Sequence, residues 1–124
     1  MAAHRGGNIV LCIGNDFVNL NLRCAHLKGH GWSVVSSGKG HDGVFRFSSE
    51  PIDAVVIDLD GDGSEAALIA AELKRRREDV PVILLVGDEK TLVPGATRQA
   101  DAVLLKSEET KVLHRTLKNV LHKA

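Results

Sequence analysis

The sequence has no long apolar run and no excess of charge of one sign. Its first apolar run, at 8–13, is too short to serve as the core of a signal peptide or to span a membrane, so we expect a cytoplasmic protein without a membrane segment. Sixteen Lys and Arg balance sixteen Asp and Glu, which gives no electrostatic reason to expect nucleic-acid binding. Internal repeats and low-complexity tracts are also absent.

Cysteine is scarce as well, with two in 124 residues. Cys12 lies in an apolar run and Cys24 in a helical pattern, which is typical of small buried residues in a reduced protein, although a disulfide between them stays open. What the chain does have is 44% hydrophobic and 26% charged residues, as in soluble globular proteins. We expect a single domain over 1–124, with a flexible N-terminus at 1–7.

Short apolar runs rich in β-branched residues predict five strands. They lie at 8–13, 32–35, 53–58, 81–86 and 102–105. The third and fourth runs are continuously apolar, which is typical of parallel strands that helices cover on both faces.

Helical patterns separate several of these strands. The clearest covers 64–79, with Ser64 as its N-cap, and others cover 17–31 and 108–124. Residues 40–49 form a poor helical pattern, and Pro94 and Gly95 interrupt the segment before the last strand, so a helix there should be short or irregular. Alternating strands and helices predict an α/β fold with a doubly wound, five-stranded parallel sheet and helices on both faces.

Ligands in such sheets bind at the carboxyl ends of the strands. The predicted strand ends carry Asn15 and Asp16, Asp58, the segment 86–88, and Lys106. We therefore expect these groups to lie along one edge of the sheet.

The stretch "IDAVVIDLDGDGSEA" at 52–66 has three aspartates, each separated from the next by one residue. A calcium loop beginning at Asp58 would need a glutamate at its twelfth position, where Ile69 stands, and a helix instead of a strand before it. The same stretch resembles the first motif of haloacid-dehalogenase-type phosphatases, with Asp58 as nucleophile and Asp60 as general acid. Those enzymes usually carry the motif on their first strand, not on the third.

The whole chain resembles the receiver domain of two-component response regulators, the CheY-like family. The resemblance rests on "GWSVVSSGKGHDGV", "EPIDAVVIDLD", "REDVPVILLV" and "QADAVLLK", which follow one another in the spacing of a receiver. It implies that Asp58 stands at the phospho-accepting position and that Lys106 is the lysine that contacts the phosphoryl group. It also implies a histidine kinase or another signalling protein as the partner.

Several family positions are altered here. Receivers end their first strand with acidic residues that hold Mg²⁺, and by register these positions are Gly14 and Asn15. Val86 replaces the hydroxyl residue that senses the phosphoryl group, and Val103 replaces the aromatic switch residue. Both residues that usually respond to the phosphoryl group in a receiver are therefore replaced.

These departures leave two forms of the receiver hypothesis. In the leading one, the chain is not an enzyme and acts by protein–protein contact, Asp58 and Lys106 form a residual ion pair, and Mg²⁺ binding and phosphorylation are weak or absent. In the other, the chain is a working phospho-receiver whose Mg²⁺ is held by Asp58, Asn15 and a substitute carboxylate from Asp16 or Asp60. The small phosphatase is the alternative of another class.

Two surface features have competing interpretations. Lys111, Arg115 and Lys118 form a basic stripe on the last predicted helix, either as a solvated surface or as a partner-binding face. His26 and His30, four residues apart, fit a metal site or, better, a solvated pair at the end of a helix. A homodimer is a further partner hypothesis.

Overall fold

A parallel β-sheet forms the centre of the molecule. The computed structural model describes residues 9–121; the N-terminus predicted at 1–7 lies outside them. The five strands are β1 (Ile9–Gly14), β2 (Ser33–Ser37), β3 (Ala54–Asp58), β4 (Val82–Val86) and β5 (Ala102–Leu105). Each lies within two residues of its predicted range. They pair in the order β2-β1-β3-β4-β5, with every pair parallel.

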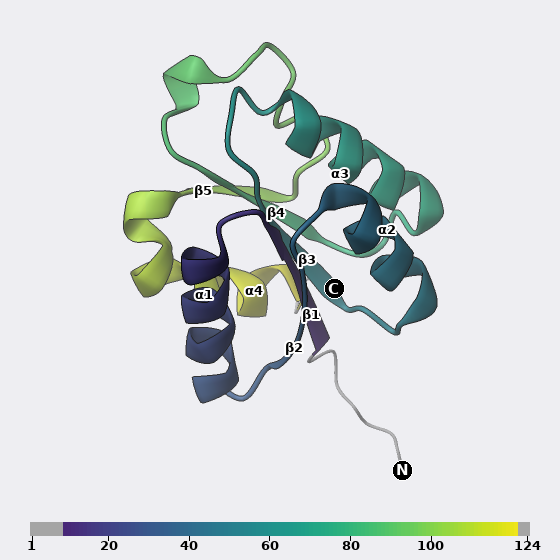
Figure 1. Ribbon diagram of the computed structural model, residues 1–124, viewed down its shortest axis with the longest axis vertical. Coiled ribbons are helices and arrows are strands. Elements are labelled where there is room, and N and C mark those ends of the chain that lie inside the picture. Colours follow the sequence, from purple (N-terminus) through teal and green to yellow (C-terminus); the bar gives the residue numbers. More distant parts are fainter. Residues whose placement is uncertain (1–8, 122–124) are drawn as a thin grey trace.

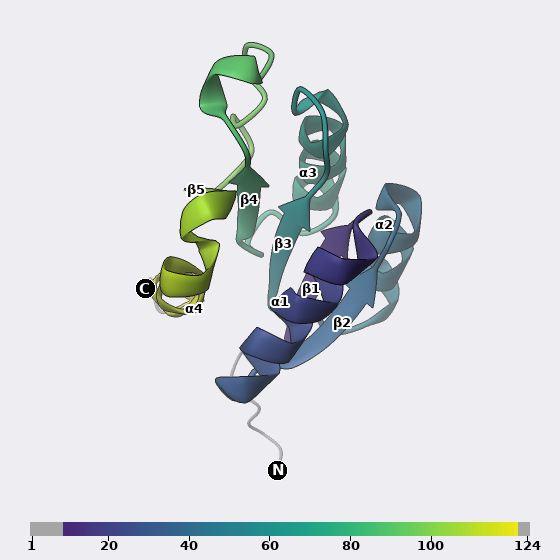
Figure 2. The same cartoon turned by 60° about the vertical axis from the view of Figure 1, so that its left-hand side comes forward.

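Helices cover both faces of the sheet, as predicted. Helices α1 (Phe17–Gly29) and α4 (Glu109–Leu121) pack on one face, and α2 (Gly40–Ser49) and α3 (Ser64–Arg76) pack on the other (Figures 1 and 2). Successive strand residues point to opposite faces. Leu11 and Ile13 of β1 therefore join the core under α2 and α3, while Val10 and Cys12 join the core under α1 and α4. Within residues 9–121, no helix is long and apolar enough to cross a membrane.

The prediction that residues 40–49 form helix poorly is wrong, because α2 occupies this range. Two of its residues, Gly40 and Gly43, are buried where the helix approaches its neighbours closely. A Cβ added to Gly43 would lie 2.5 Å from Cδ1 of Ile13, so the absence of side chains lets the helix lie against β1. Phe47, which is fully buried, anchors the same face of α2 in the core. Tertiary packing therefore outweighs the weak local propensity.

The prediction of a short or irregular helix between β4 and β5 is confirmed. This connection contains one 3₁₀ turn, Glu89–Thr91, followed by further turns up to β5. Its backbone is tied to the loop after β3, where Val93 N–H donates to the Asp62 carbonyl at 2.8 Å. Ser64 is not the N-cap of α3, since Gly63 holds that position with φ of 87°, and the Asp62 carboxylate accepts from Ser64 N–H instead.

Histidine and tryptophan rings connect α1 to α4 on the face of the sheet that these two helices cover. His30, the residue that follows α1, stacks on His114 of α4 with ring centroids 4.0 Å apart, and His26 of α1 meets His30 edge to face at 4.8 Å. Trp32 Nε1–H donates to Nδ1 of His114 at 2.9 Å, which requires an unprotonated Nδ1. The expected solvated pair is thus part of a cluster that includes a third histidine.

Acidification is expected to destabilise this helix pair. Burial, followed by the charges of His30, Lys118 and His26, lowers the pKa of His114 below its usual value. A histidine with a depressed pKa contributes its full stability above the unfolded pKa of about 6.5 and loses it as the pH falls below that value. Urea unfolding followed by fluorescence of the single tryptophan, at pH values of about 7.5 and about 5.5, measures the loss.

His114→Gln is the test of this assignment, because glutamine retains an acceptor for Trp32 and does not titrate. The variant should show a smaller fall in stability between the two pH values than the wild type. His41→Gln, at an exposed histidine of α2, is the matched control and should retain the wild-type dependence. Equal pH dependence in wild type and His114→Gln would contradict the assignment.

Candidate functional site

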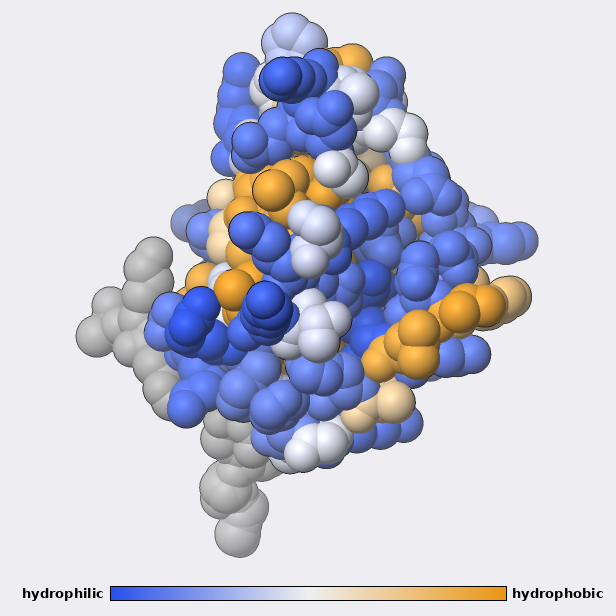
Figure 3. Space-filling view, turned by 90° about the vertical axis from the view of Figure 1, so that its left-hand side faces the viewer, coloured by the Kyte–Doolittle hydropathy of each residue, from blue (hydrophilic) through white to orange (hydrophobic). Residues whose placement is uncertain are grey.

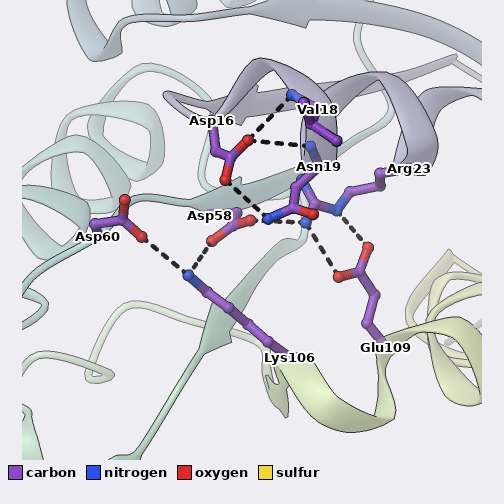
Figure 4. A network of polar contacts seen from close by, with 8 residues as sticks. All are labelled: Asp16, Val18, Asn19, Arg23, Asp58, Asp60, Lys106 and Glu109. Atoms are coloured by element: carbon purple, nitrogen blue, oxygen red, sulfur yellow. Dashed lines mark hydrogen bonds and ion pairs between the residues drawn. The ribbon is translucent and has the colours of Figure 1, made fainter.

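The strand ends bring Asp58 and Lys106 together, as the sequence predicts. Asp58 is the last residue of β3 and is 4% exposed, and Lys106 follows β5 directly. Lys106 Nζ lies 2.7 Å from Asp58 Oδ1 and 3.2 Å from Asp60 Oδ1 (Figure 4). Lys106 Nζ is not oriented to donate a hydrogen bond to Oδ1, so this contact is an ion pair only. Within residues 9–121, this buried oxygen accepts no hydrogen bond. Asp60 itself is largely exposed.

A residue that the sequence analysis did not select, Arg23, reaches the same carboxylate from α1. Its Nη2 donates to Asp58 Oδ2 at 2.7 Å. Glu109, the first residue of α4, also holds the guanidinium: it accepts from the same Nη2 at 3.1 Å and from Nε (Figure 4). Arg23 is 4% exposed, so a buried chain of charges links β3, α1 and α4.

Both cations of this site remain charged. Burial would lower the pKa of Arg23, but the hydrogen bonds and charges of Glu109 and Asp58 outweigh burial and raise it. For Lys106, burial is likewise outweighed by Asp58 and Asp60, which raise the pKa. Asp58 is thus paired with one cation at each oxygen, and the desolvation of these buried charges is offset within the chain.

The end of β1 makes a different contribution from the one predicted. Asp16 is the N-cap of α1: its Oδ1 accepts from the backbone N–H groups of Val18 and Asn19 at 3.0 and 3.2 Å. Its Oδ2 accepts from the Asn19 side chain at 3.0 Å (Figure 4). Asn15 is exposed and lines a hollow beside α2 and α3 with Phe17. The structure therefore assigns the Asp16 carboxylate to the start of a helix.

The residues at this edge do not fit a magnesium ion. Within residues 9–121, no group of three or more His, Cys, Asp or Glu is arranged to hold a metal. A Cβ added to Gly14 would lie 3.7 Å from Nη1 of Arg23, so the guanidinium stands beside the position where a first-strand carboxylate would begin. A divalent cation at Asp58 would meet a fixed positive charge there.

The remaining predicted residues are not members of this charge network, although Val86 lines a pocket beside it together with Asp60 and Lys106. Val86 ends β4 in the apolar core, and Val103 of β5 packs against that core half-buried, so neither supplies a hydroxyl or an aromatic ring. Lys111, Arg115 and Lys118 are exposed on α4. Their role in partner binding remains a prediction.

The sequence contained a signal for Arg23. Leu20, Arg23 and Leu27 are the buried residues of α1, and their spacing of three and four places an arginine within an apolar stripe. A charged residue at such a position must find a buried partner. Glu109 gave no comparable signal, because glutamate at the start of a helix is common.

Comparisons with known proteins agree on the architecture. No family model matches the chain. The transcriptional regulatory proteins GlrR and QseF of Escherichia coli are each 24% identical to it over 98% of this chain, which spans 28% of their length. The response regulator TrrA of Thermotoga maritima, in complex with Mg²⁺ and BeF, is 21% identical with a TM-score of 0.83, over 92% of this chain and 99% of that chain.

Two further solved structures widen this comparison. The receiver domain of a sensor histidine kinase from Pseudomonas aeruginosa, with a magnesium ion in its active site cleft, has a TM-score of 0.79 at 21% identity, over 94% of this chain and 99% of that chain. TrrA in complex with the histidine kinase ThkA has a TM-score of 0.80 at 21% identity, over 92% of this chain and 98% of that chain. The chain has the CheY-like fold of response-regulator receiver domains.

Proposed function

We propose that this chain is a non-enzymatic receiver module of two-component signalling that acts by protein–protein contact in the cytoplasm, with phosphorylation of Asp58 weak or absent. The observation that carries the proposal is the pairing of each Asp58 oxygen with a cation of the chain itself. Phosphoryl transfer needs a free carboxylate oxygen as nucleophile and charge compensation for the incoming phosphoryl group. Here the compensating charge of Arg23 already binds the carboxylate in the resting protein.

The phosphatase hypothesis receives less support from this geometry. It needs Asp60 as a general acid that faces a substrate held at Asp58. The Asp60 side chain is instead largely exposed, and its carboxylate pairs with Lys106.

An apolar face of α1 is a suitable docking surface for a histidine kinase or another signalling protein. Phe17, Val18 and Leu22 are 73%, 68% and 64% exposed, and the last two lie on the same face of the helix. Figure 3, which looks at the side of α1 and α4, shows apolar areas among charged side chains. We include the basic residues of α4, Lys111, Arg115 and Lys118, in the proposed surface, because that helix contacts α1.

Binding to histidine kinases of the same organism, measured by biolayer interferometry with and without acetyl phosphate and Mg²⁺, tests the proposal. We expect wild type and Asp58→Asn to bind alike, and the phosphodonor to change neither affinity. Leu22→Asp should weaken binding about tenfold or more, because it places a charge in the apolar face. Phe45→Asp, at a similarly exposed apolar residue of α2, is the matched control.

Two results would count against the proposal. Asp58-dependent strengthening of binding by acetyl phosphate would favour the working phospho-receiver. Equal loss of binding in Leu22→Asp and Phe45→Asp, or absence of any kinase contact, would remove the proposed surface.

A further inference from the structure

We propose that the Arg23 guanidinium is a built-in substitute for the divalent cation at Asp58, and that Gly14 and Arg23 together make this site independent of metal. The inference rests on the proposed function in one respect, because it explains how the negative charge of Asp58 in a receiver-type site is compensated without a metal ion. It assigns a role to two residues that the resemblance to receivers leaves without one.

The position of the guanidinium is the first argument. Nη2 of Arg23 is 2.7 Å from Asp58 Oδ2, while Lys106 approaches Oδ1. A magnesium ion would need to lie about 2.1 Å from a carboxylate oxygen with further oxygen ligands around it. The guanidinium and a hydrated ion cannot both occupy the space in front of Oδ2.

The absence of a side chain at Gly14 is the second argument. Gly14 pairs with Asp58 across β1 and β3, and its backbone φ lies outside the left-handed range, so the chain does not need glycine there for conformational reasons. An added Cβ would meet Asp58 O at 3.3 Å, Leu20 Cδ1 at 3.6 Å and Arg23 Nη1 at 3.7 Å. The guanidinium therefore lies in van der Waals contact with the point where a side chain at residue 14 would begin, and the atoms of a longer side chain would start from that contact.

The support behind Arg23 is the third argument. Glu109 accepts from Nε and from Nη2, the same nitrogen that donates to Asp58, so two carboxylates fix the orientation of the planar group. A tethered cation with two charged partners does not dissociate, in contrast to a bound metal ion. The charge of Asp58 is thus compensated at any Mg²⁺ concentration.

Titration with Mg²⁺ alone, followed by amide NMR at residues 14–15 and 58–61, tests the inference in four proteins. These are the wild type, Gly14→Asp, Arg23→Gln and the double variant Gly14→Asp/Arg23→Gln. We expect no saturable shifts in the wild type or in Gly14→Asp, where Arg23 neutralises the new carboxylate. The double variant should bind Mg²⁺ saturably, at least roughly tenfold more tightly than any of the others, because a repelling charge is replaced by an attracting one.

Arg75→Gln is the matched control, since it removes the same charge from the exposed face of α3 and should leave the wild-type response unchanged. Saturable Mg²⁺ shifts around Asp58 in the wild type or in Gly14→Asp would overturn the inference, and both proteins retain Arg23. A folded double variant that ignores Mg²⁺ would overturn it as well. Kinase binding is measured separately, so loss of the proposed function and loss of this inference give different results.

Discussion

Arg23→Met is expected to lower the free energy of unfolding by about 3 kcal/mol, the lower end of the cost of removing one partner from a buried ion pair. Methionine retains much of the length and apolar contact of the arginine stem but leaves Asp58 with Lys106 alone. Lys106 is partly exposed, so it compensates the buried carboxylate incompletely. Urea unfolding followed by Trp32 fluorescence measures the change.

Two comparisons separate this effect from a general loss of charge. Arg115→Met, on the exposed face of α4, should change stability by less than about 0.5 kcal/mol. Adding Asp58→Asn to Arg23→Met should recover part of the loss, because a buried amide costs less than a buried carboxylate that has lost one of its two cations. If Arg23→Met and Arg115→Met prove equally stable, the buried charges do not hold α1 against β3 and α4.

The architecture was predictable because its strongest signals are local. The continuous apolar runs at β3 and β4 and the periodic pattern of α3 identify their elements without knowledge of their neighbours. The parallel arrangement of the strands then places their carboxyl ends at one edge of the sheet, which predicts that Asp58 and Lys106 lie close together. Irregularity before β5 followed from Pro94 and Gly95 in the same way.

The site was predictable only in part, because its charge balance depends on how a helix is rotated. The resemblance to receivers identified Gly14 as a position that lacks the family's carboxylate. It did not identify the group that lies beside this position in the structure. That information lies in the face of α1 that turns Arg23 inward, and in the start of α4, which brings Glu109 within reach. The candidate carboxylate of Asp16 was misleading because a side chain directly before a helix has a competing use as its cap.

Gly43→Ala is expected to destabilise the protein by about 2 kcal/mol, although alanine favours an isolated helix over glycine by about 1 kcal/mol. The added Cβ would lie 2.5 Å from Cδ1 and 2.9 Å from Cγ1 of Ile13, a fully buried residue whose side chain would have to shift within the packed core. Gly29→Ala, at the last residue of α1 with no atom within 4 Å of the new Cβ, is the control. It should be neutral or stabilising.

Ile13→Val tests whether this close approach is the cause, because it deletes the Cδ1 methyl that the new Cβ would meet. Alone it should cost about 1 kcal/mol. Combined with Gly43→Ala, the two changes should cost clearly less than their sum, since the added and the deleted carbon occupy the same space. Additive losses would mean that Gly43 matters for its backbone and not for its contact with β1. Non-additive losses would show that α2 is held by tertiary packing, which is why its sequence alone did not predict a helix.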